Sequence, residues 1–158
     1  MPSFGSRSTT HLSTVHPALQ ALFAAVVVKY DCSVLSGRRT AEEQQELHAT
    51  GKSTKDGITS FSRHQPEAYE PGVLPLDGGG LPLVSAVDVA VYPIDWNDRD
   101  RFLHFAGYVD GVATSMGITL RWGGDWNRNA YTDLGGLRDQ TFFDLVHFEI
   151  HALDARWK

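Results

Sequence analysis

The sequence has little cysteine, no strong positive charge and no long hydrophobic run. Cys32 is its single cysteine, so an internal disulfide is impossible. Its 14 Lys and Arg residues are dispersed and outnumbered by 19 Asp and Glu, for a net charge of −5, which argues against a nucleic-acid partner. The longest apolar run, residues 18–28, is interrupted by Gln20 and is shorter than the roughly 20 residues that cross a bilayer. We therefore expect no stable membrane association.

The N-terminal stretch MPSFGSRSTTHLS has no apolar core of a secretion signal. We therefore expect that the protein is made in a cytoplasm. Its 158 residues, 42% hydrophobic and 21% charged, have the size and composition of one globular domain. Residues 1–158 are accordingly predicted to form a single domain, and the absence of an appended repeat domain favours a monomer.

Helical periodicity is clearest in residues 17–30 and 98–116. A shorter polar helix is predicted to follow Thr40, because Thr40 and Glu43 fit the capping-box pattern that opens a helix. Four short apolar or alternating segments have the pattern of strands: residues 32–35, 85–92, 118–122 and the closing segment near 144–151. This order favours an α+β fold with a small, mostly antiparallel sheet and helices packed on it, rather than a βαβ repeat.

Residues 50–84 separate two of these strands and are rich in glycine and proline without a sustained period. They are predicted to form a long irregular excursion, and loops of that length within a compact domain are usually functional.

The closing segment FFDLVHFEIH places titratable residues among large apolar ones. Strand alternation puts His147 and Glu149 on the face opposite Phe148. Asp144 has the parity of the apolar face, where a charge is costly to bury. We therefore predict a bend between Asp144 and His147 that brings both to one site.

Four residues are candidates for a catalytic zinc site, which needs three protein ligands, an open position for water and a nearby carboxylate to take a proton. They are His64, Asp88, Asp144 and His147. Asp88 is unusual because it stands in the middle of a predicted strand, where aspartate is disfavoured. Each residue alone also has a structural explanation, such as a satisfied histidine or an aspartate paired with an arginine, and their spacing is not that of a known local zinc motif.

Together these elements resemble the M15 family of zinc peptidases, which includes D-alanyl-D-alanine peptidases and the phage endolysins that cut peptidoglycan between L-alanine and D-glutamate. SGRRT (residues 36–40), SRH (62–64) with SAVD (85–88), and DLVHFE (144–149) are similar to family motifs and occur in the family's order. The segment LRWGGDWN (120–127) is similar to one found in phage lysins. The resemblance covers nearly the whole chain and implies the Hedgehog/D,D-peptidase-like architecture of that family.

The resemblance also implies roles for single residues. The implied Zn²⁺ ligands are His64, Asp88 and His147, and the implied general base and acid is Asp144. Arg39, which matches the motif position better than Arg38, would face the substrate carbonyl or a nearby carboxylate as a catalytic and substrate-binding cation. The remaining implied site residues are Ser62 and Trp126 at the substrate and Glu149 behind a ligand. For Trp126, a purely structural turn is an equally good explanation.

The sequence departs from the family pattern in one place. The family histidine and aspartate usually lie close together, as S-x-H-x-x-G-x-A-x-D, whereas His64 and Asp88 are 24 residues apart. An insertion of this kind, at about 65–84, costs little closure entropy in a surface loop. Its GVLPLDGGGLPLV stretch is predicted to form a hairpin at the rim of the cleft, which could shape substrate choice.

By resemblance, the expected activity is zinc-dependent hydrolysis of the L-alanyl-D-glutamate bond in the stem peptides of bacterial peptidoglycan. The expected setting is the host bacterial cytoplasm, with action on the wall after release. Two alternatives stay open from the sequence: a D,D- or L,D-carboxypeptidase acting on the ends of stem peptides, and a non-catalytic wall-binding module that kept the fold.

Overall fold

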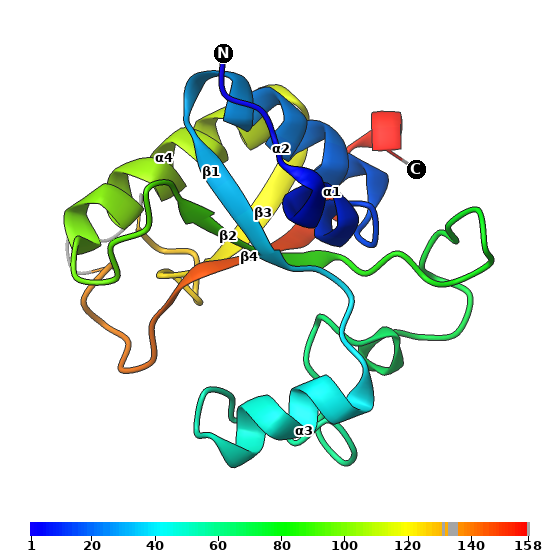
Figure 1. Cartoon of the computed structure of the whole chain (residues 1–158). Helices are drawn as coiled ribbons and strands as arrows, with labels where there is room; N and C mark the ends of the chain where they lie inside the picture. The colour runs from blue at the N-terminus through cyan, green and yellow to red at the C-terminus, as the bar shows by residue number, and fades with distance from the viewer. Residues whose placement is uncertain (131, 133–135, 158) are drawn as a thin grey trace.

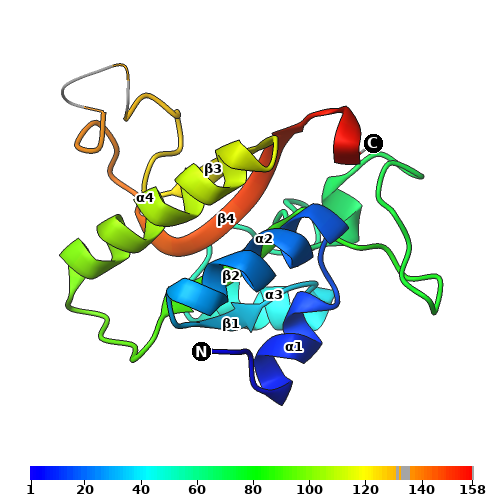
Figure 2. The same cartoon turned by 90° about the horizontal axis from the view of Figure 1, so that it is seen from above.

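The computed structural model describes residues 1–130, 132 and 136–157. A four-stranded sheet lies at the centre, with α2 and α4 on one side of it (Figures 1 and 2). The elements in chain order are α1 (Ser6–Leu12), α2 (Pro17–Lys29), β1 (Cys32–Ser36), α3 (Ala41–Ala49), a 3₁₀ turn (Pro66–Ala68), β2 (Ala86–Val91), α4 (Arg99–Ser115), β3 (Ile118–Gly123), β4 (Asp144–Leu153) and a 3₁₀ turn (Ala155–Trp157).

The sheet has the strand order β1-β2-β4-β3, and every neighbouring pair is antiparallel. Its central strand β2 is buried along its whole length. Asp88 on β2 pairs with Ser36 on β1 and with His147 on β4. Because directly paired residues point to the same face of a sheet, this register gathers the polar side chains of three strands on one face.

The opposite face carries the hydrophobic core. Phe148 of β4 lies edge-on to Phe23 of α2, at 5.6 Å between ring centroids, and to Phe105 of α4, at 6.1 Å. All three side chains are almost fully buried, and the burial of each contributes about 2–3 kcal/mol to folding. The alternation of β4 is therefore used on both sides, with Phe148 in the core and its neighbours His147 and Glu149 on the polar face.

The α+β fold with a small antiparallel sheet is confirmed, and the predicted helices and strands all form. Thr40 and Glu43 make the predicted capping box, Asp98 caps α4, and Gly117 follows α4 with a φ of 70°. Helix α1 was missing from the sequence prediction. It buries only Leu12, so it has no apolar stripe by which to recognise it.

The first half of β4 is irregular, as the predicted bend requires. Trp122 of β3 pairs with Phe148, whereas the next residue, Gly123, pairs with Asp144. Three residues of β4 thus lie between successive pairs, and such bulges bend the strand; the curvature of β4 is visible in Figure 2. The bend lies between Asp144 and His147, as predicted, and the structure makes it as a bulge inside β4, which begins at Asp144.

Residues 50–84 form the predicted irregular excursion, apart from the short 3₁₀ turn. The stretch near its end projects from the sheet as a loop (green in Figure 1). It contains the predicted hairpin, since Leu76 bridges Pro82 and the Asp77 side chain accepts hydrogen bonds from the Gly79 and Leu81 amides around the glycine tip. Tyr69 joins the excursion to β2, because its hydroxyl donates to the Arg63 carbonyl and accepts from the Ser85 amide.

Candidate metal centre

Three side chains from distant parts of the chain meet on the polar face of the sheet. Nε2 of His64 lies 3.1 Å from Oδ1 of Asp88 and 3.2 Å from Nδ1 of His147, and the last two atoms are 3.3 Å apart. All three residues are buried. The three atoms thus form a nearly equilateral triangle, formed by the three residues expected to be metal ligands.

The hydrogen-bond partners decide which atoms of the triangle carry protons. Nδ1 of His64 lies 2.7 Å from the Gly37 carbonyl oxygen, which can only accept, so the proton of neutral His64 is on Nδ1. Nε2 of His147 lies 2.8 Å from Oε2 of Glu149, which places the proton of neutral His147 on Nε2. In its neutral form each histidine therefore points a lone pair toward the Asp88 carboxylate, so a cation at this point would have three electron-rich atoms as ligands.

The triangle has the dimensions of a zinc site. Tetrahedral zinc with bonds of about 2.0–2.1 Å places its ligand atoms about 3.3 Å apart. The observed separations of 3.1–3.3 Å match this spacing, and the His₂Asp donor set suits zinc while leaving a fourth position open. The described residues thus fit a catalytic metal ion of this kind.

Glu149 and Arg121 stand behind His147. Arg121 of β3 pairs with Glu149 in the sheet register and donates from Nε to Oε1 of Glu149 at 2.8 Å. Burial raises the pKa of Glu149, but the hydrogen bond and charge of His147, together with Arg121, outweigh it and lower the pKa. An ionised Glu149 fixes the orientation of the His147 ring, as carboxylates do for metal-binding histidines.

Negative charge around His147 favours a cation at this point. Burial lowers the pKa of His147, but the hydrogen bonds and charges of Asp88 and Glu149 outweigh it and raise the pKa to about 9. Burial also raises the pKa of Asp88, yet the two histidines and Arg39 hold it well below its usual range. Asp88 is therefore an ionised carboxylate inside the protein.

Arg39 faces a carboxylate, as one form of the sequence prediction held, and that carboxylate belongs to Asp88. The Arg39 Nη2 atom pairs with Oδ2 of Asp88, Nε donates to Ser36 Oγ at 2.9 Å, and Nη1 donates to Gln44 Oε1 at 3.2 Å. All three nitrogen atoms thus have protein partners. Arg39 orients Asp88 through the oxygen that does not face the histidines.

His64 belongs to the irregular excursion rather than to the sheet. Its backbone carbonyl accepts from the Arg39 amide at 2.9 Å, and its amide donates to Ser62 Oγ at 3.3 Å. Burial lowers its pKa, so that the ring is neutral and able to bind a metal. Gly37, whose carbonyl faces the His64 ring, is itself packed closely against α1 and the residues after it, since a Cβ there would lie 2.2 Å from Thr14 Oγ1 and 2.4 Å from the His11 carbonyl oxygen.

Asp144 belongs to the same electrostatic cluster without being one of the three converging residues. Burial and the Asp88 charge raise its pKa, while His147, His64 and Arg39 act in the opposite direction. A carboxyl group whose pKa lies above its ordinary value exchanges protons near neutral pH more readily than a surface aspartate. Its position next to the ligands is consistent with the predicted role of base and acid.

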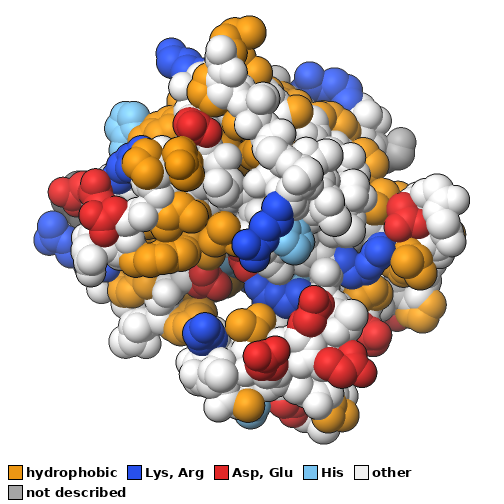
Figure 3. Space-filling model, in the orientation of Figure 1, with side chains coloured by type: hydrophobic (Ala, Val, Ile, Leu, Met, Phe, Trp, Pro, Cys, Tyr) orange, Lys and Arg blue, Asp and Glu red, His pale blue; other side chains and the backbone are white. Residues whose placement is uncertain are grey.

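An aromatic wall borders the site. The Trp126 ring lies 5.3 Å from the His147 ring and stacks on Phe142 at 6.0 Å. Trp126 Nε1 donates to the Phe142 carbonyl, so this ring pair is fixed. Figure 3 shows basic, acidic and histidine side chains meeting in the middle of one face of the molecule, beside a hydrophobic area. Contact of Trp126 or Ser62 with a substrate stays a prediction.

Sequence reasoning missed two supporting residues, Gln44 and Arg121. Gln44 is fully buried, and apart from Arg39 it binds Ser53 and the Lys55 carbonyl. It lies in a helix that otherwise reads as polar and exposed, so nothing in the sequence marks it. Arg121 could be linked to Glu149 only through the strand register, which the bulges in β4 obscure.

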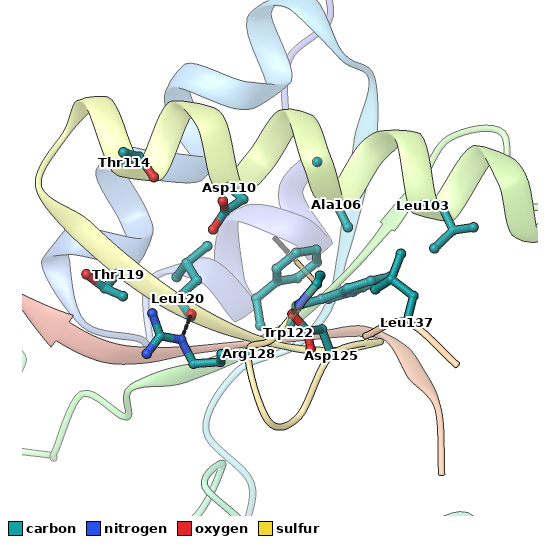
Figure 4. Close-up of a pocket in the computed structure, with 13 residues that line it drawn as sticks. Leu103, Ala106, Asp110, Thr114, Thr119, Leu120, Trp122, Asp125, Arg128 and Leu137 are labelled. Carbon is teal, nitrogen blue, oxygen red and sulfur yellow. Dashed lines mark hydrogen bonds between the residues drawn. The ribbon is translucent and has the colours of Figure 1, made fainter. Parts of the chain in front are cut away.

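A cavity of about 400 Å³ lies apart from these residues, on the core side of the sheet between α4 and β3 (Figure 4). Leu103, Ala106 and Leu120 line it, and at its edge Arg128 donates to the Leu120 carbonyl. None of the expected ligands or catalytic residues faces this cavity.

Within the described part of the chain, no helix combines the length and hydrophobicity needed to cross a membrane.

The fold and the site together have the make-up of a metal-dependent hydrolase: a small α+β domain with a buried His-Asp-His cluster beside a carboxyl group of raised pKa. The chain belongs to the phage L-alanyl-D-glutamate peptidase family, whose model matches residues 2–151. The L-alanyl-D-glutamate peptidase of Escherichia phage T5 is 33% identical over 130 residues, covering 78% of this chain and 81% of that protein. The crystal structure of the Serratia marcescens L-Ala D-Glu endopeptidase ChiX matches with a TM-score of 0.62 and 25% identity, covering 94% of this chain and 90% of that chain.

Proposed function

We propose that this protein is a peptidoglycan hydrolase that cleaves the L-alanyl-D-glutamate bond of cell-wall stem peptides. Membership of a family of this activity supports the choice of bond. The single observation that carries the chemistry is the triangle of His64 Nε2, Asp88 Oδ1 and His147 Nδ1, whose atoms lie 3.1–3.3 Å apart. In this proposal the protein is a monomer of one catalytic domain, made in the cytoplasm of the host bacterium and acting on the wall after release.

In the proposed mechanism, His64, Asp88 and His147 would hold Zn²⁺. When bound, zinc supplies a Lewis acid that lowers the pKa of an attacking water and polarises the scissile carbonyl. Glu149 keeps the His147 ring in the required tautomer, and Arg39 fixes the orientation of the Asp88 carboxylate. The chain thereby presents a preorganised site whose charges need little rearrangement during the reaction.

Asp144 moves the proton in this mechanism. Its carboxylate accepts a proton from the water as the water attacks the amide carbon, and then donates it to the nitrogen of the leaving D-glutamate. Burial and the nearby Asp88 charge, which raise its pKa, favour both steps because they make the protonated form accessible. General acid and base catalysis of this kind contributes about 10²- to 10⁴-fold to a rate.

A groove next to Asp88, on the Arg39 side of the metal centre, supports an endopeptidase over a carboxypeptidase. A groove of about 470 Å³ includes Asp88 and Arg39 and continues between α1 and α3 to Arg7 and Lys52 at the surface. A peptide can extend along such a groove beyond the bond that is cut. A carboxypeptidase instead needs a wall that stops the chain one residue past the scissile bond.

Mass spectrometry of purified peptidoglycan after digestion tests the proposal. We expect new N-terminal D-glutamate with release of the L-alanine carboxyl group, whereas loss of terminal D-alanine would indicate the carboxypeptidase, and binding without cleavage the wall-binding module. Asp144→Ala should retain zinc by elemental analysis and lose about 10²- to 10⁴-fold in turnover. The matched control is Asp100→Asn, an exposed acid in the first turn of α4. Wild-type rates in Asp144→Ala would refute the role of Asp144.

A further inference from the structure

Arg38 has a different environment from its neighbour Arg39, although both line the same groove. Its Nη1 atom donates to the Pro82 carbonyl at 2.7 Å and to Oδ2 of Asp77 at 3.3 Å. Those two bonds use both protons of Nη1. Among the residues that the structure describes, none accepts a hydrogen bond from Nε or Nη2 of Arg38.

The position of Arg38 is fixed from two directions. Its backbone amide donates to Thr14 Oγ1 at 2.8 Å, next to the closely packed Gly37. Its Nη1 contacts belong to the hairpin of the inserted segment, which is closed by the Leu76–Pro82 bridge. The side chain is only 20% exposed. Little side-chain entropy therefore remains to be lost when this arginine binds a ligand.

The Nε and Nη2 donors of an arginine form a planar fork that matches the two oxygens of a carboxylate. We propose that Arg38 binds a carboxylate of the stem peptide and thereby fixes the direction in which the peptide lies across the metal centre. This inference rests on the proposed function. Arg39 does not supply such a fork, because Ser36, Gln44 and Asp88 occupy its three nitrogen atoms.

The chemistry of the substrate explains why a carboxylate gives direction. A glutamyl residue has two carboxyl groups, and only one of them continues the peptide, so the other is a free carboxylate just past the scissile bond. On the other side, the alanine carboxyl is consumed in that bond. Anionic groups therefore lie on the leaving-group side of the scissile bond. A carboxylate-binding arginine in the groove would hold that side of the peptide near Arg38. The carboxylate could come from the D-glutamyl residue or from the end of the stem.

Synthetic stem peptides distinguish these two sources. One peptide carries the D-glutamyl carboxylate as a carboxamide, and a second carries only its C-terminal carboxylate as a carboxamide. For the wild-type enzyme we expect one of the two amidations to lower kcat/KM by roughly 10- to 100-fold, as for loss of a hydrogen bond to a charged group. The loss should lie in KM rather than in kcat, because the contact is already made in the ground state.

Three variants test whether Arg38 makes this contact. In Arg38→Gln the ratio of kcat/KM between the free and the amidated peptide should fall close to one, with zinc content unchanged. Arg7→Gln removes the same charge from the same groove and should keep the wild-type ratio. Asp77→Asn retains the Arg38 fork while weakening its link to the hairpin, and should keep a preference for the free carboxylate. This variant separates the fork from the stability of the hairpin.

Three results would overturn the inference: a wild-type enzyme that cleaves all peptides equally well, an Arg38→Gln variant that keeps the preference, or an Arg7→Gln variant that loses it to the same extent. If no peptide is cleaved, the proposed function fails instead. Calorimetric binding of the same peptides to the zinc-loaded proteins then tests Arg38 separately, and an equal Kd for free and amidated peptides would refute its role.

Discussion

The metal centre draws its ligands from two regions that are built in different ways. Asp88 and His147 are direct partners in an antiparallel ladder, so the backbone register of β2 and β4 sets their separation. His64 comes from residues 50–65, a segment without a ladder. Its place depends on side chains that bind the backbone. Sheet pairing therefore fixes the positions of Asp88 and His147, whereas polar contacts fix the position of His64.

The polar contacts of the 50–65 segment centre on two buried glutamines and one aspartate. Gln65 accepts from the Ser62 amide and donates to the Gly57 carbonyl, which closes the turn beside His64. Asp56 accepts from the Thr59 hydroxyl and from three backbone amides, and these hydrogen bonds lower its pKa. Buried polar contacts are costly when one partner is lost. The segment is thus expected to be the more easily displaced of the two regions.

Removal of the metal should have the largest effect, and it should affect the two regions to different extents. A chelator is expected to abolish peptidoglycan cleavage. It should also raise amide hydrogen exchange near His64, because the segment then loses its link to the sheet through the shared ion. Exchange in β2 should change much less, since both of its edges are hydrogen-bonded to other strands.

Readdition of zinc provides the control and should restore both activity and protection. Exchange measured by mass spectrometry on peptides from 57–66 and 86–91 resolves the two regions. Equal deprotection of both peptides would show that the ladder does not hold its half of the site independently. Full activity in the presence of the chelator would refute a metal-dependent mechanism altogether.

The same contrast explains what could be predicted from the sequence. Strand alternation is a local property, so it correctly placed His147 and Glu149 opposite Phe148, and it marked Asp88 as out of place in a strand. The predicted bend between Asp144 and His147 forms, and it takes the form of a bulge because the pairing partner of each residue depends on β3. Family motifs, rather than periodicity, pointed to His64.

Contacts that depend on the tertiary fold could not be predicted. Gln44 is buried only because the 50–65 segment folds over α3, and Arg121 meets Glu149 only through the sheet register. Arg38 occupies a variable motif position, so resemblance favoured Arg39, while the inserted hairpin gives Arg38 its partners. In each case the partner lies in a segment whose path the sequence does not determine locally.

Gln44→Ala should have the next largest effect and tests the weaker region directly. The substitution leaves the Lys55 carbonyl and one Arg39 donor without partners, at about 1–3 kcal/mol for each buried group. We expect a clear fall in Tm and a lower zinc affinity, because both His64 and Arg39 lose support. The neighbouring Gln45 is exposed on the same helix, so Gln45→Ala is the matched control and should leave both values unchanged. A Gln44→Ala protein as stable as the control would show that the segment is held by something other than this side chain.

Labelling of Cys32 should show the smallest effect, and it tests whether the sheet opens independently of the segment that carries His64. Cys32 lies in the sheet, so its reaction with a thiol reagent reports opening of the sheet. It pairs with Val91 in the ladder of β1 and β2 and is 4% exposed. Burial and the Asp31 charge raise its pKa to about 12, so the reactive thiolate is scarce in the folded protein at pH 8. Labelling by a thiol reagent therefore requires the sheet to open. We expect the same slow labelling rate with zinc and with chelator, although exchange near His64 differs between the two states, and fast labelling in denaturant. If chelation accelerates Cys32 labelling in step with exchange near His64, the two regions open together and the metal stabilises the whole domain rather than one segment.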